Sequence, residues 1–556
     1  MKRTWWKESV VYQIYPRSFN DSTGNGVGDI PGIIEKLDYI KSLGVDVIWL
    51  CPVYESPNDD NGYDISDYRK ISKDFGGQEA FDALLEQMHQ KGLKLVMDLV
   101  ANHTSDEHHW FKASKKSKDN PYRDYYIWKD GVNEGPPTNW ESFFNGSTWQ
   151  YDKTTDQYYL HYFTKKQPDL NWENPKVRRE IYDVIEYWFK KGVDGFRMDV
   201  ISLISKPKVF EDSNYASFQD TIVNIYANGP KIHQYLHDMN QEVLSKFDIM
   251  TVGEGPGINL ENGLQYVDEK RQELDMVFHF DHLFIDCGEG GKYDPQPFGL
   301  PKFKKVFSDW DVALSNGGWG SIFLGNHDFS RMVSRFGNNS VYHEASAKLL
   351  ATLLLTMRGT VYVYQGDEIG MTNVAYPTIK TYNDVETLNA WKEAKNNGKD
   401  MDAFLKIIHA QSRDNARTPM QWNASKNAGF SDGSPWLPAN PNYVDINVEQ
   451  QETRSHSILN YYREMIRFRK EYPILVYGHY ECLMEDHPEL FVYRRWDEEM
   501  EFLVLHNMSD TSQRVQGNLR QRDYILSKTN LQNHLEDIFY LAAWQTKVLL
   551  KKTQSR

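Results

Sequence analysis

Two acidic residues each stand at the end of a short apolar run, where a buried strand would end. Asp199 closes the run GFRMD, and Glu254 closes the run DIMTVGE. Two carboxyl groups about 5 Å apart, one ionised and one protonated, can cleave a glycosidic bond with retention of configuration. Strand alternation places Arg197 on the same face as Asp199, and a guanidinium beside a carboxylate favours its charged form. Asp199 is therefore the candidate nucleophile, and Glu254 is the candidate general acid/base.

Each of these motifs alone has a simpler interpretation. Arg197 and Asp199 could form an ordinary ion pair at a strand end, and Glu254 could be a solvated loop residue. Polar residues also end two further apolar runs, however, in the stretches GNHD and DLVANH. These residues are Asp98, Asn102, His103, His327 and Asp328. Polar clusters at four strand ends indicate one shared site.

Short apolar runs alternate with amphipathic segments along most of the chain, which predicts parallel βαβ units. The apolar runs cover residues 10–15, 47–50, 93–99, 195–198, 250–252, 322–324 and 361–364. The amphipathic segments cover residues 31–43, 80–90, 177–190 and 346–357. We therefore expect an α/β protein with a closed (β/α)8 TIM barrel, whose site residues meet at the carboxyl ends of the strands.

Two long segments, 104–173 and 376–450, interrupt the alternation, and segments of this length in a compact protein usually carry function. Both follow apparent strands, so we expect them to form walls of the site. Residues 1–103 and 174–477 would form the catalytic barrel, with 104–173 as a domain inserted after the third strand. Short alternating runs predict an antiparallel β-sandwich domain over residues 478–556.

The bulk properties of the 556-residue chain narrow the function further. Its formal net charge of -15 argues against nucleic acid or an anionic membrane as a partner, because polyanions would repel it. The longest apolar stretch, 349–357, is far shorter than the ~20 residues that span a bilayer, and the first residues lack the apolar core of a signal peptide. Cys51, Cys287 and Cys482 lie far apart without metal-ligand spacing. We expect a cytoplasmic monomer that acts on a small substrate.

The glycine-rich stretch DSTGNGVGD spaces oxygen-bearing residues as the opening positions of a calcium loop do. The candidate ligands are Asp21, Thr23, Asn25, the Val27 carbonyl and Asp29. Gly32 stands where a bidentate glutamate would complete such a loop, so the affinity would be low. Two interpretations stay open, namely a structural Ca2+ or Mg2+ site and a glycine-rich turn without metal.

The chain resembles glycoside hydrolase family 13, in its oligo-1,6-glucosidase and α-glucosidase branch, over essentially its whole length. The motifs that carry the resemblance are VYQIYPRSF, NGYDISDY, DLVANHTS, QPDLNW, GFRMDV, TVGE, GNHD, YQGDEIGM and SRDNARTPMQW. The resemblance implies that Asp199 forms a covalent glucosyl intermediate and that Glu254 protonates the leaving group. It also implies that Asp328 binds the sugar hydroxyls in the transition state, and that catalysis needs no cofactor.

The same resemblance implies a subsite for one glucose unit. Its residues would be Asp60, Tyr63, His103, Gln167, Arg197, Val200, His327 and Arg413. Tyr63 would stack against the sugar ring, while Asp60 and Arg413 would close the pocket beyond the 4-hydroxyl, which makes the enzyme exo-acting. Two alternatives stay open: Tyr63 could belong to the core, and Arg417 could exchange roles with Arg413 or only brace its loop.

Val200 carries the specificity signal, since a valine after the nucleophile goes with α-1,6 preference in the resembled branch and an alanine with α-1,4. A branched side chain is stiff and can crowd a leaving sugar that approaches at the wrong angle, although Val200 could merely pack. Gly255 and the stretch GNHDFSR depart from the branch, where methionine and NNHDQPR are usual. Both departures concern the leaving-group side.

The prediction is an exo-acting retaining α-glucosidase that hydrolyses terminal α-1,6-linked glucose from short, isomaltose-like oligosaccharides. Trehalose-6-phosphate hydrolase is the nearest alternative, because DVISLISK also resembles that branch, and a sucrose-active enzyme is another. A phosphorylated substrate requires a basic pocket, which the acidic balance of the chain does not support. A non-catalytic barrel protein is disfavoured, because Asp199, Glu254 and Asp328 are all present.

Overall fold

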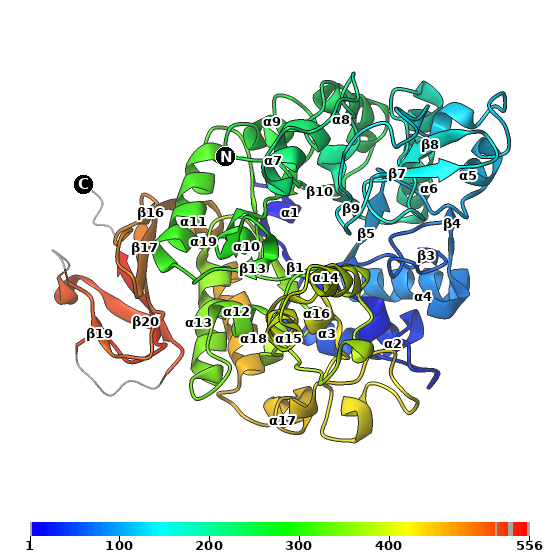
Figure 1. Ribbon diagram of the computed structural model, residues 1–556. Coiled ribbons are helices and arrows are strands. Elements are labelled where there is room, and N and C mark those ends of the chain that lie inside the picture. Colours follow the sequence, from blue (N-terminus) through cyan, green and yellow to red (C-terminus); the bar gives the residue numbers. More distant parts are fainter. Residues whose placement is uncertain (1–2, 517–519, 532–536, 553–556) are drawn as a thin grey trace.

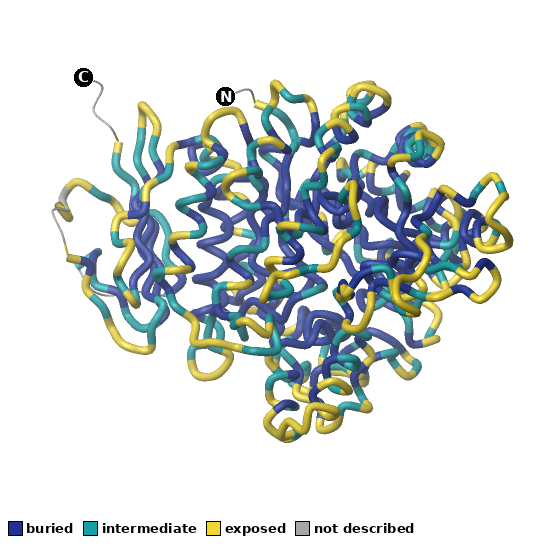
Figure 2. Tube along the Cα trace, turned by 45° about the horizontal axis from the view of Figure 1, so that its top comes forward, coloured by how far each residue is buried: buried dark blue, intermediate teal, exposed yellow. Residues whose placement is uncertain are grey.

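The computed structural model describes residues 3–516, 520–531 and 537–552 of the chain. A barrel of eight parallel strands forms its centre, and antiparallel sheets built from the end of the chain lie to one side (Figure 1). Buried residues concentrate in and around the barrel, whereas exposed residues mark the outer loops (Figure 2). Within the described ranges, no helix is long and apolar enough to cross a bilayer.

The barrel strands neighbour one another in the order in which they occur along the chain. They are β1 (Val10–Ile14), β2 (Val47–Leu50), β5 (Lys94–Val100), β9 (Gly195–Asp199), β10 (Met250–Glu254), β11 (Met276–Phe278), β14 (Ser321–Ile322) and β15 (Thr360–Tyr364). β15 pairs with β1, with Val361 opposite Val10. The Ser321 hydroxyl of β14 donates to the Val277 carbonyl of β11 at 2.8 Å, which joins the remaining two edges. The predicted α/β barrel is confirmed.

One barrel strand, β11, has no counterpart among the apolar runs that the sequence revealed. It spans only three residues, Met276–Phe278, so it is too short to show a pattern of its own. Its pairing with β10, where Phe278 lies opposite Glu254, holds it in the sheet. A strand of this kind is specified by its neighbours rather than by its own sequence.

Helices cover the outside of the barrel (Figure 1), and their ends follow capping rules. The principal ones are α2 (Ile30–Glu35), α3 (Leu37–Leu43), α4 (Gly77–Gln90), α6 (Pro175–Lys191), α8 (Ile232–Glu242), α11 (Leu300–Leu314), α13 (His343–Thr356) and α18 (Ile458–Glu471). Asn174 caps α6 by accepting from the Lys176 N–H, and Pro175 takes the first helical position. Gly192 ends α6 at φ 106°, a left-handed conformation that favours glycine.

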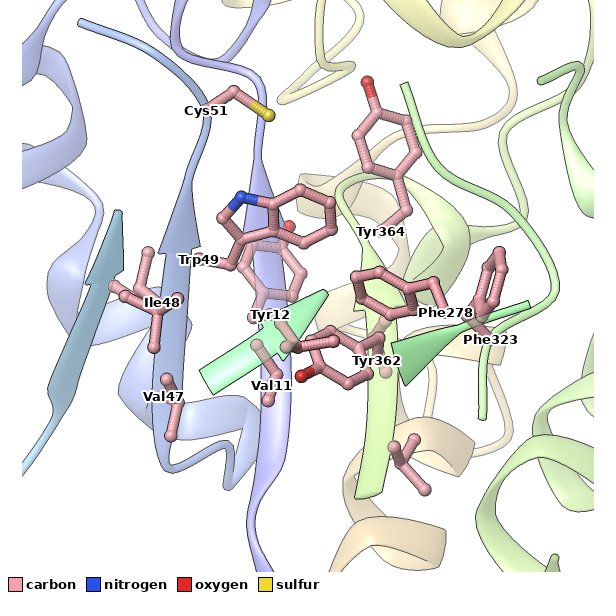
Figure 3. Close-up of a cluster of buried hydrophobic side chains, with 14 of the residues drawn as sticks. Val11, Tyr12, Val47, Ile48, Trp49, Cys51, Phe278, Phe323, Tyr362 and Tyr364 are labelled. Carbon is pink, nitrogen blue, oxygen red and sulfur yellow. The ribbon is translucent and has the colours of Figure 1, made fainter. Parts of the chain in front are cut away.

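Aromatic side chains fill the barrel interior (Figure 3). The Trp49 ring centroid lies 5.6 Å from that of Phe278 and 6.2 Å from that of Tyr362, and Phe278 lies 4.7 Å from Tyr362. All three rings are buried, so they form a close-packed hydrophobic cluster inside the barrel. The Trp49 indole N–H donates to Asp98 Oδ2 at 2.8 Å, which connects this cluster to the polar residues of the site.

The two long segments of the sequence meet each other beside the barrel. The first contains α5 (His109–Ser114) and an antiparallel sheet with the order β6 (Trp128–Lys129), β8 (Gln157–Leu160), β7 (Trp149–Asp152). The second contains α14 (Val385–Asn396), α15 (Met401–Gln411) and α16 (Asp414–Arg417). The Asn389 amide of α14 donates to the Phe144 carbonyl of the first segment at 2.8 Å. The two segments are thus in direct contact.

The end of the chain forms two antiparallel sheets. The larger has the order β16 (His479–Cys482), β17 (Leu490–Trp496), β18 (Met500–Asn507), β22 (Thr546–Lys552), β20 (Ile525–Thr529), and the smaller joins β19 (Gln513–Arg514) to β21 (Tyr540–Leu541). A small core that includes Leu503, Leu541 and Leu549 lies between the sheets, so the predicted sandwich is confirmed. Tyr493 and Phe502, on the other face of the larger sheet, belong to the barrel core.

Candidate active site

One guanidinium holds the two predicted catalytic carboxyl groups together. Asp199 ends β9, Glu254 ends the adjacent β10, and Arg197 contacts both. Arg197 Nη1 donates to Asp199 Oδ1 at 2.8 Å, and Nη2 lies 2.6 Å from Glu254 Oε1. Nη1 also donates to Asp98 Oδ1 at 2.5 Å. The two carboxyl groups therefore share one cation at the end of the barrel, whereas the sequence paired Arg197 with Asp199 alone.

The electrostatics of this cluster favour a retained proton. Burial raises the pKa of Asp199 well above its usual value, and the Arg197 guanidinium only partly offsets this effect. Burial likewise raises the pKa of Glu254, again against Arg197. One buried cation faces three carboxyl groups, so protons leave the pair in coupled steps. A state with one ionised and one protonated carboxyl is what retaining glycoside cleavage requires.

Asp328, the third predicted catalytic residue, is held as an anion. Its Oδ1 accepts from Arg417 Nη2 at 2.8 Å and from Arg413 Nη1 at 3.2 Å, and its Oδ2 lies 3.1 Å from His327 Nε2. Burial alone would raise the pKa of Asp328, but the charge of a protonated His327 ring and the Arg413 and Arg417 guanidinium groups hold it well below its usual value. Both arginines therefore contact the same carboxylate.

Asp60 contacts Arg413, which also contacts Asp328. Arg413 Nη2 lies 3.3 Å from Asp60 Oδ1, and its guanidinium lies 4.8 Å from the centre of the Phe144 ring. Gln167 Nε2 donates to Asp60 Oδ2 at 3.2 Å and lies 3.3 Å from His103 Nε2. Burial raises the pKa of Asp60 to about 6, against the opposing effect of Arg413. Of the two arginines that the sequence left interchangeable, Arg413 is the one that contacts Asp60.

Tyr63 belongs to both the core and the site. Its ring is buried and stacks on the His327 ring, with centroids 5.3 Å apart and an interplanar angle of 7°. Its hydroxyl lies 2.7 Å from His327 Nε2, and Gln13 Nε2 lies 2.8 Å from Nδ1 of the same ring. Burial lowers the pKa of His327 to about 3, so the ring is neutral near pH 7. Contacts of this kind link the predicted polar residues of the site into one cluster.

Val200 has an unusual backbone conformation directly after the candidate nucleophile. Its φ of 36° and ψ of 41° lie in the left-handed region, which a β-branched residue rarely adopts and which stores strain. Its N–H donates to Glu254 Oε2 at 3.1 Å. The side chain is buried. Val200 therefore aims a backbone donor at the candidate acid, a feature that its side-chain type could not predict.

Comparison with known proteins identifies the family. The sequence profile described as the catalytic domain of α-amylases matches residues 13–478. The chain belongs to glycoside hydrolase family 13. The oligo-1,6-glucosidase of Parageobacillus thermoglucosidasius is 54% identical to it, over 95% of this chain and 94% of that protein. The trehalose-6-phosphate hydrolase of Bacillus subtilis is 48% identical, over 91% of this chain and 90% of that protein. The crystal structure of isomaltulose synthase from Klebsiella sp. LX3 matches at 44% identity with a TM-score of 0.96, over 100% of both chains.

Three charged residues of this family 13 enzyme join the site without a motif that predicted them. Arg413 Nη2 lies 2.6 Å from Asp384 Oδ1, and its Nε lies 3.4 Å from Glu386 Oε2. Lys292 Nζ lies 2.5 Å from the same Glu386 oxygen. Asp384 also caps α14 through the N–H groups of Glu386 and Thr387. The stretch DVET is thus readable as a helix start, but its contact with Arg413 depends on the fold.

The departure at Gly255 has a steric reason in this glycoside hydrolase. A Cβ on Gly255 would lie 2.4 Å from Ile258 Cδ1 and 2.7 Å from its Cγ1. Such an approach is too close for carbon atoms, so a larger residue here would require the Ile258 side chain to move. The absence of a side chain at this position is therefore matched by the bulk of Ile258.

The loop predicted to bind an ion uses its carboxylates as hydrogen-bond acceptors. Asp21 accepts from three backbone N–H groups, including that of Thr23, at 2.7 to 2.9 Å. Asp29 caps α2, and Asn25 Oδ1 accepts from the Val27 N–H at 2.8 Å. Across the described residues, no group of three or more His, Cys, Asp or Glu side chains is placed to hold a metal, but the predicted ligand set holds only two such residues, Asp21 and Asp29. A bound Ca2+ or Mg2+ and the turn without metal both stay predictions.

Proposed function

We propose that this family 13 enzyme is an exo-acting retaining α-glucosidase that removes terminal α-1,6-linked glucose from short, isomaltose-like oligosaccharides. The observation that carries the proposal is the joint geometry of two clusters. Asp199 and Glu254 share the Arg197 guanidinium, and Arg413 joins Asp60 to Asp328. The Asp60–Arg413 pair would close the site beyond a terminal sugar, so the site would accept the end of a chain rather than its middle.

The reaction would proceed in two displacements. Asp199 attacks the anomeric carbon of the terminal glucose while Glu254 transfers its proton to the glycosidic oxygen, so the leaving sugar departs as an alcohol. The Glu254 carboxylate then takes a proton from a water molecule, whose oxygen attacks the same carbon and releases glucose. Both carboxyl groups return to their starting states. Asp328, held ionised by Arg413 and Arg417, would bind sugar hydroxyls.

The preference for α-1,6 linkages has two supports. The relative with 54% identity is named an oligo-1,6-glucosidase, and another in Bacillus subtilis, 46% identical over 100% of both chains, is named a probable one. Val200 directly follows the nucleophile, in a strained conformation. Its stiff side chain would therefore lie beside the reacting bond, where its shape would affect which linkage fits. Cytoplasmic location and a monomeric state stay predictions.

Initial rates on isomaltose, maltose, sucrose and trehalose 6-phosphate test the proposal. We expect isomaltose to give the highest kcat/KM, with α-glucose as the first product. Trehalose-6-phosphate hydrolase is the second candidate, because one relative of that name is 48% identical. Lys292, at the Arg413 cluster, is already paired with Glu386, which makes it less available to a phosphate. Dominant turnover of trehalose 6-phosphate would replace our proposal with that one.

A further inference from the structure

A buried lysine that the proposed reaction does not use joins separate segments of the chain behind His103. Lys206 Nζ donates to Asn102 Oδ1 at 2.7 Å, to Asp169 Oδ2 at 2.5 Å and to the Leu203 carbonyl at 2.8 Å. The ammonium has three N–H donors, and each has an oxygen acceptor. The Lys206 side chain is only 6% exposed, so its surroundings fix the direction of all three contacts.

The contact with Asn102 decides which way that side-chain amide points. An amide offers one acceptor oxygen and one NH2 donor, and an ammonium can only donate, so Lys206 must face the oxygen. The Asn102 NH2 is thereby directed at His103 Nδ1, 3.2 Å away. Nδ1 has to accept this hydrogen bond. In a neutral imidazole, the proton then resides on Nε2.

His103 Nε2 faces the residues predicted to bind glucose. It lies 3.2 Å from the Tyr63 carbonyl, which can only accept and therefore agrees with a proton on Nε2. Gln167 Nε2, 3.3 Å away, is itself a donor, so this contact is not a hydrogen bond when Nε2 is protonated, and the Gln167 NH2 donates to Asp60 instead. Burial lowers the pKa of His103 to about 4, so the ring is neutral near pH 7. His103 thus offers an N–H donor on this side.

We propose that Lys206 is a positioning residue that sets the tautomer of His103, so that the glucose subsite presents an N–H donor to a sugar hydroxyl. The inference rests on the proposed glucosidase function, in which His103 contacts the terminal glucose. Lys206 holds the Asn102 oxygen, and the Asn102 NH2 holds His103 Nδ1. The proton on Nε2, 3.2 Å from the Tyr63 carbonyl, would then be shared with a sugar hydroxyl. Without the ammonium, the amide is free to turn over, and both tautomers become available.

The decisive variant is Asn102→Asp, because it keeps an oxygen acceptor for Lys206 but removes the NH2. A carboxylate beside Nδ1 requires a proton there, so a neutral His103 ring then has a bare Nε2. At about pH 8.5, where imidazole is neutral, we expect glucose to bind about 10- to 100-fold more weakly, which is the loss of one strong hydrogen bond. At lower pH, a doubly protonated ring regains the Nε2 proton, so the penalty should shrink.

The pH dependence of this variant separates positioning from a merely structural role. In the native chain, the titratable groups around His103 are Lys206, Asp169, Tyr63 and, beyond Gln167, Asp60. None of these is altered by Asn102→Asp. If the His103 tautomer has no part in sugar binding, Asn102→Asp causes no loss of glucose affinity at any pH, because Lys206 keeps all of its acceptors. Glucose binding within about twofold of the native value across the range would overturn the proposal.

Lys206→Met and Lys304→Met form a matched pair. Lys304 is also a buried ammonium, and it donates to the carbonyls of Met484, His487 and Leu490, far from the site. We expect both variants to lower Tm, but only Lys206→Met to weaken glucose binding, by about tenfold or more. Lys206→Arg keeps the donors and should restore part of the affinity. Equal glucose affinity in the two methionine variants would contradict the inference.

The measurement itself distinguishes this inference from the proposed function. Glucose affinity is measured by calorimetry, so it does not require turnover. If the native enzyme fails to hydrolyse isomaltose but Asn102→Asp and Lys206→Met both weaken glucose binding as described, the proposed substrate is wrong and the role of Lys206 stands. If isomaltose is hydrolysed and both variants bind glucose normally, the proposed function stands and the role of Lys206 is wrong.

Discussion

Two buried arginine clusters hold positive charge inside this protein in opposite ways. Arg197 in the active site contacts three carboxyl groups. Arg469 and Arg495, where the barrel meets the C-terminal sheet, donate to backbone carbonyls, and no carboxylate in the described part of the chain forms an ion pair with either. A carboxyl group can take up a proton and a carbonyl cannot. The first cluster can therefore change its charge during a reaction, whereas the second keeps a fixed one.

Arg469, Arg495 and their carbonyl acceptors, here called the carbonyl cluster, connect the last barrel helices to the C-terminal sheet. Arg495 of β17 donates to the Thr356 carbonyl at 2.6 Å and to the Gly478 carbonyl at 2.9 Å. Thr356 ends α13, where the helix dipole leaves partial negative charge. Burial lowers the pKa of Arg495 to about 10 and that of Arg469 to about 9, so both stay charged near pH 7. Carbonyl dipoles thus suffice to hold a buried cation whose task is structural.

Asp199→Asn should have the largest effect, and it tests whether the Arg197 cluster is catalytic rather than structural. The change removes the nucleophile and leaves a side chain of the same shape, so kcat on isomaltose should fall by about 10⁴-fold or more. Tm should stay the same or rise, because three carboxyl groups crowd one cation and one of them becomes neutral. Rates and thermal unfolding are measured on the same preparation. A large loss of Tm with little loss of kcat would mean that this cluster is structural too.

Glu254→Gln should expose the proton that the catalytic cluster retains. Burial raises the pKa of both carboxyl groups, and catalysis requires one proton on the pair. Native activity should therefore fall as pH rises and this proton leaves, and as pH falls and a second proton binds. Glutamine can neither give nor take the proton, so the variant should lose the alkaline limb and about 10²- to 10⁴-fold in kcat. The measurement is the pH profile of kcat on isomaltose. An unchanged alkaline limb would assign the acid to another residue.

Arg495→Met, in the cluster of Arg469 and Arg495, should have the opposite effect: stability falls and kcat stays the same. The methionine leaves the carbonyls of Thr356, Leu475 and Gly478 without this donor, so we expect a loss of about 2–3 kcal/mol in unfolding free energy. The kcat of folded enzyme should not change, because the residue contacts no site residue. Urea unfolding and kcat below the transition check both parts. A fall in kcat without a fall in stability would show that the interface acts on the site.

The sequence predicted what depends on strand periodicity and missed what depends on neighbouring strands. Alternation along one strand is enough to pair Arg197 with Asp199. The contact of Arg197 with Glu254 crosses from β9 to β10, so it requires the sheet. Asp384 shows a capping pattern, which says nothing of Arg413. The carbonyl contacts of Arg469 and Arg495 leave no motif at all, since any backbone carbonyl can accept.

Val200→Ala should change specificity without touching the shared charge of the catalytic cluster. Alanine is less bulky and less stiff, so a leaving sugar joined through its 4-hydroxyl meets less crowding. We expect the ratio of kcat/KM on maltose to that on isomaltose to rise by about 10-fold, the usual effect of one or two methyl groups in a pocket. Both pH limbs should keep their positions, because the Val200 N–H still donates to Glu254. A shift of either pH limb would show that the Val200 side chain also changes the pKa values of the Asp199–Glu254 pair.

Removal of divalent ions should have the smallest effect on stability. Backbone groups stabilise the charge of Asp21, as backbone carbonyls stabilise that of Arg495: the Asp21 carboxylate accepts from backbone N–H groups and from the Ser431 hydroxyl. Burial would raise the pKa of Asp21, but these donors lower it, so the charge is already stabilised without an ion. A weakly bound ion near its Kd adds only about 0.4 kcal/mol. Tm with EDTA and with added Ca2+ should therefore differ little, and Asp21→Asn should lower Tm equally in both. A large loss of Tm with EDTA that Asp21→Asn abolishes would instead favour a Ca2+ loop.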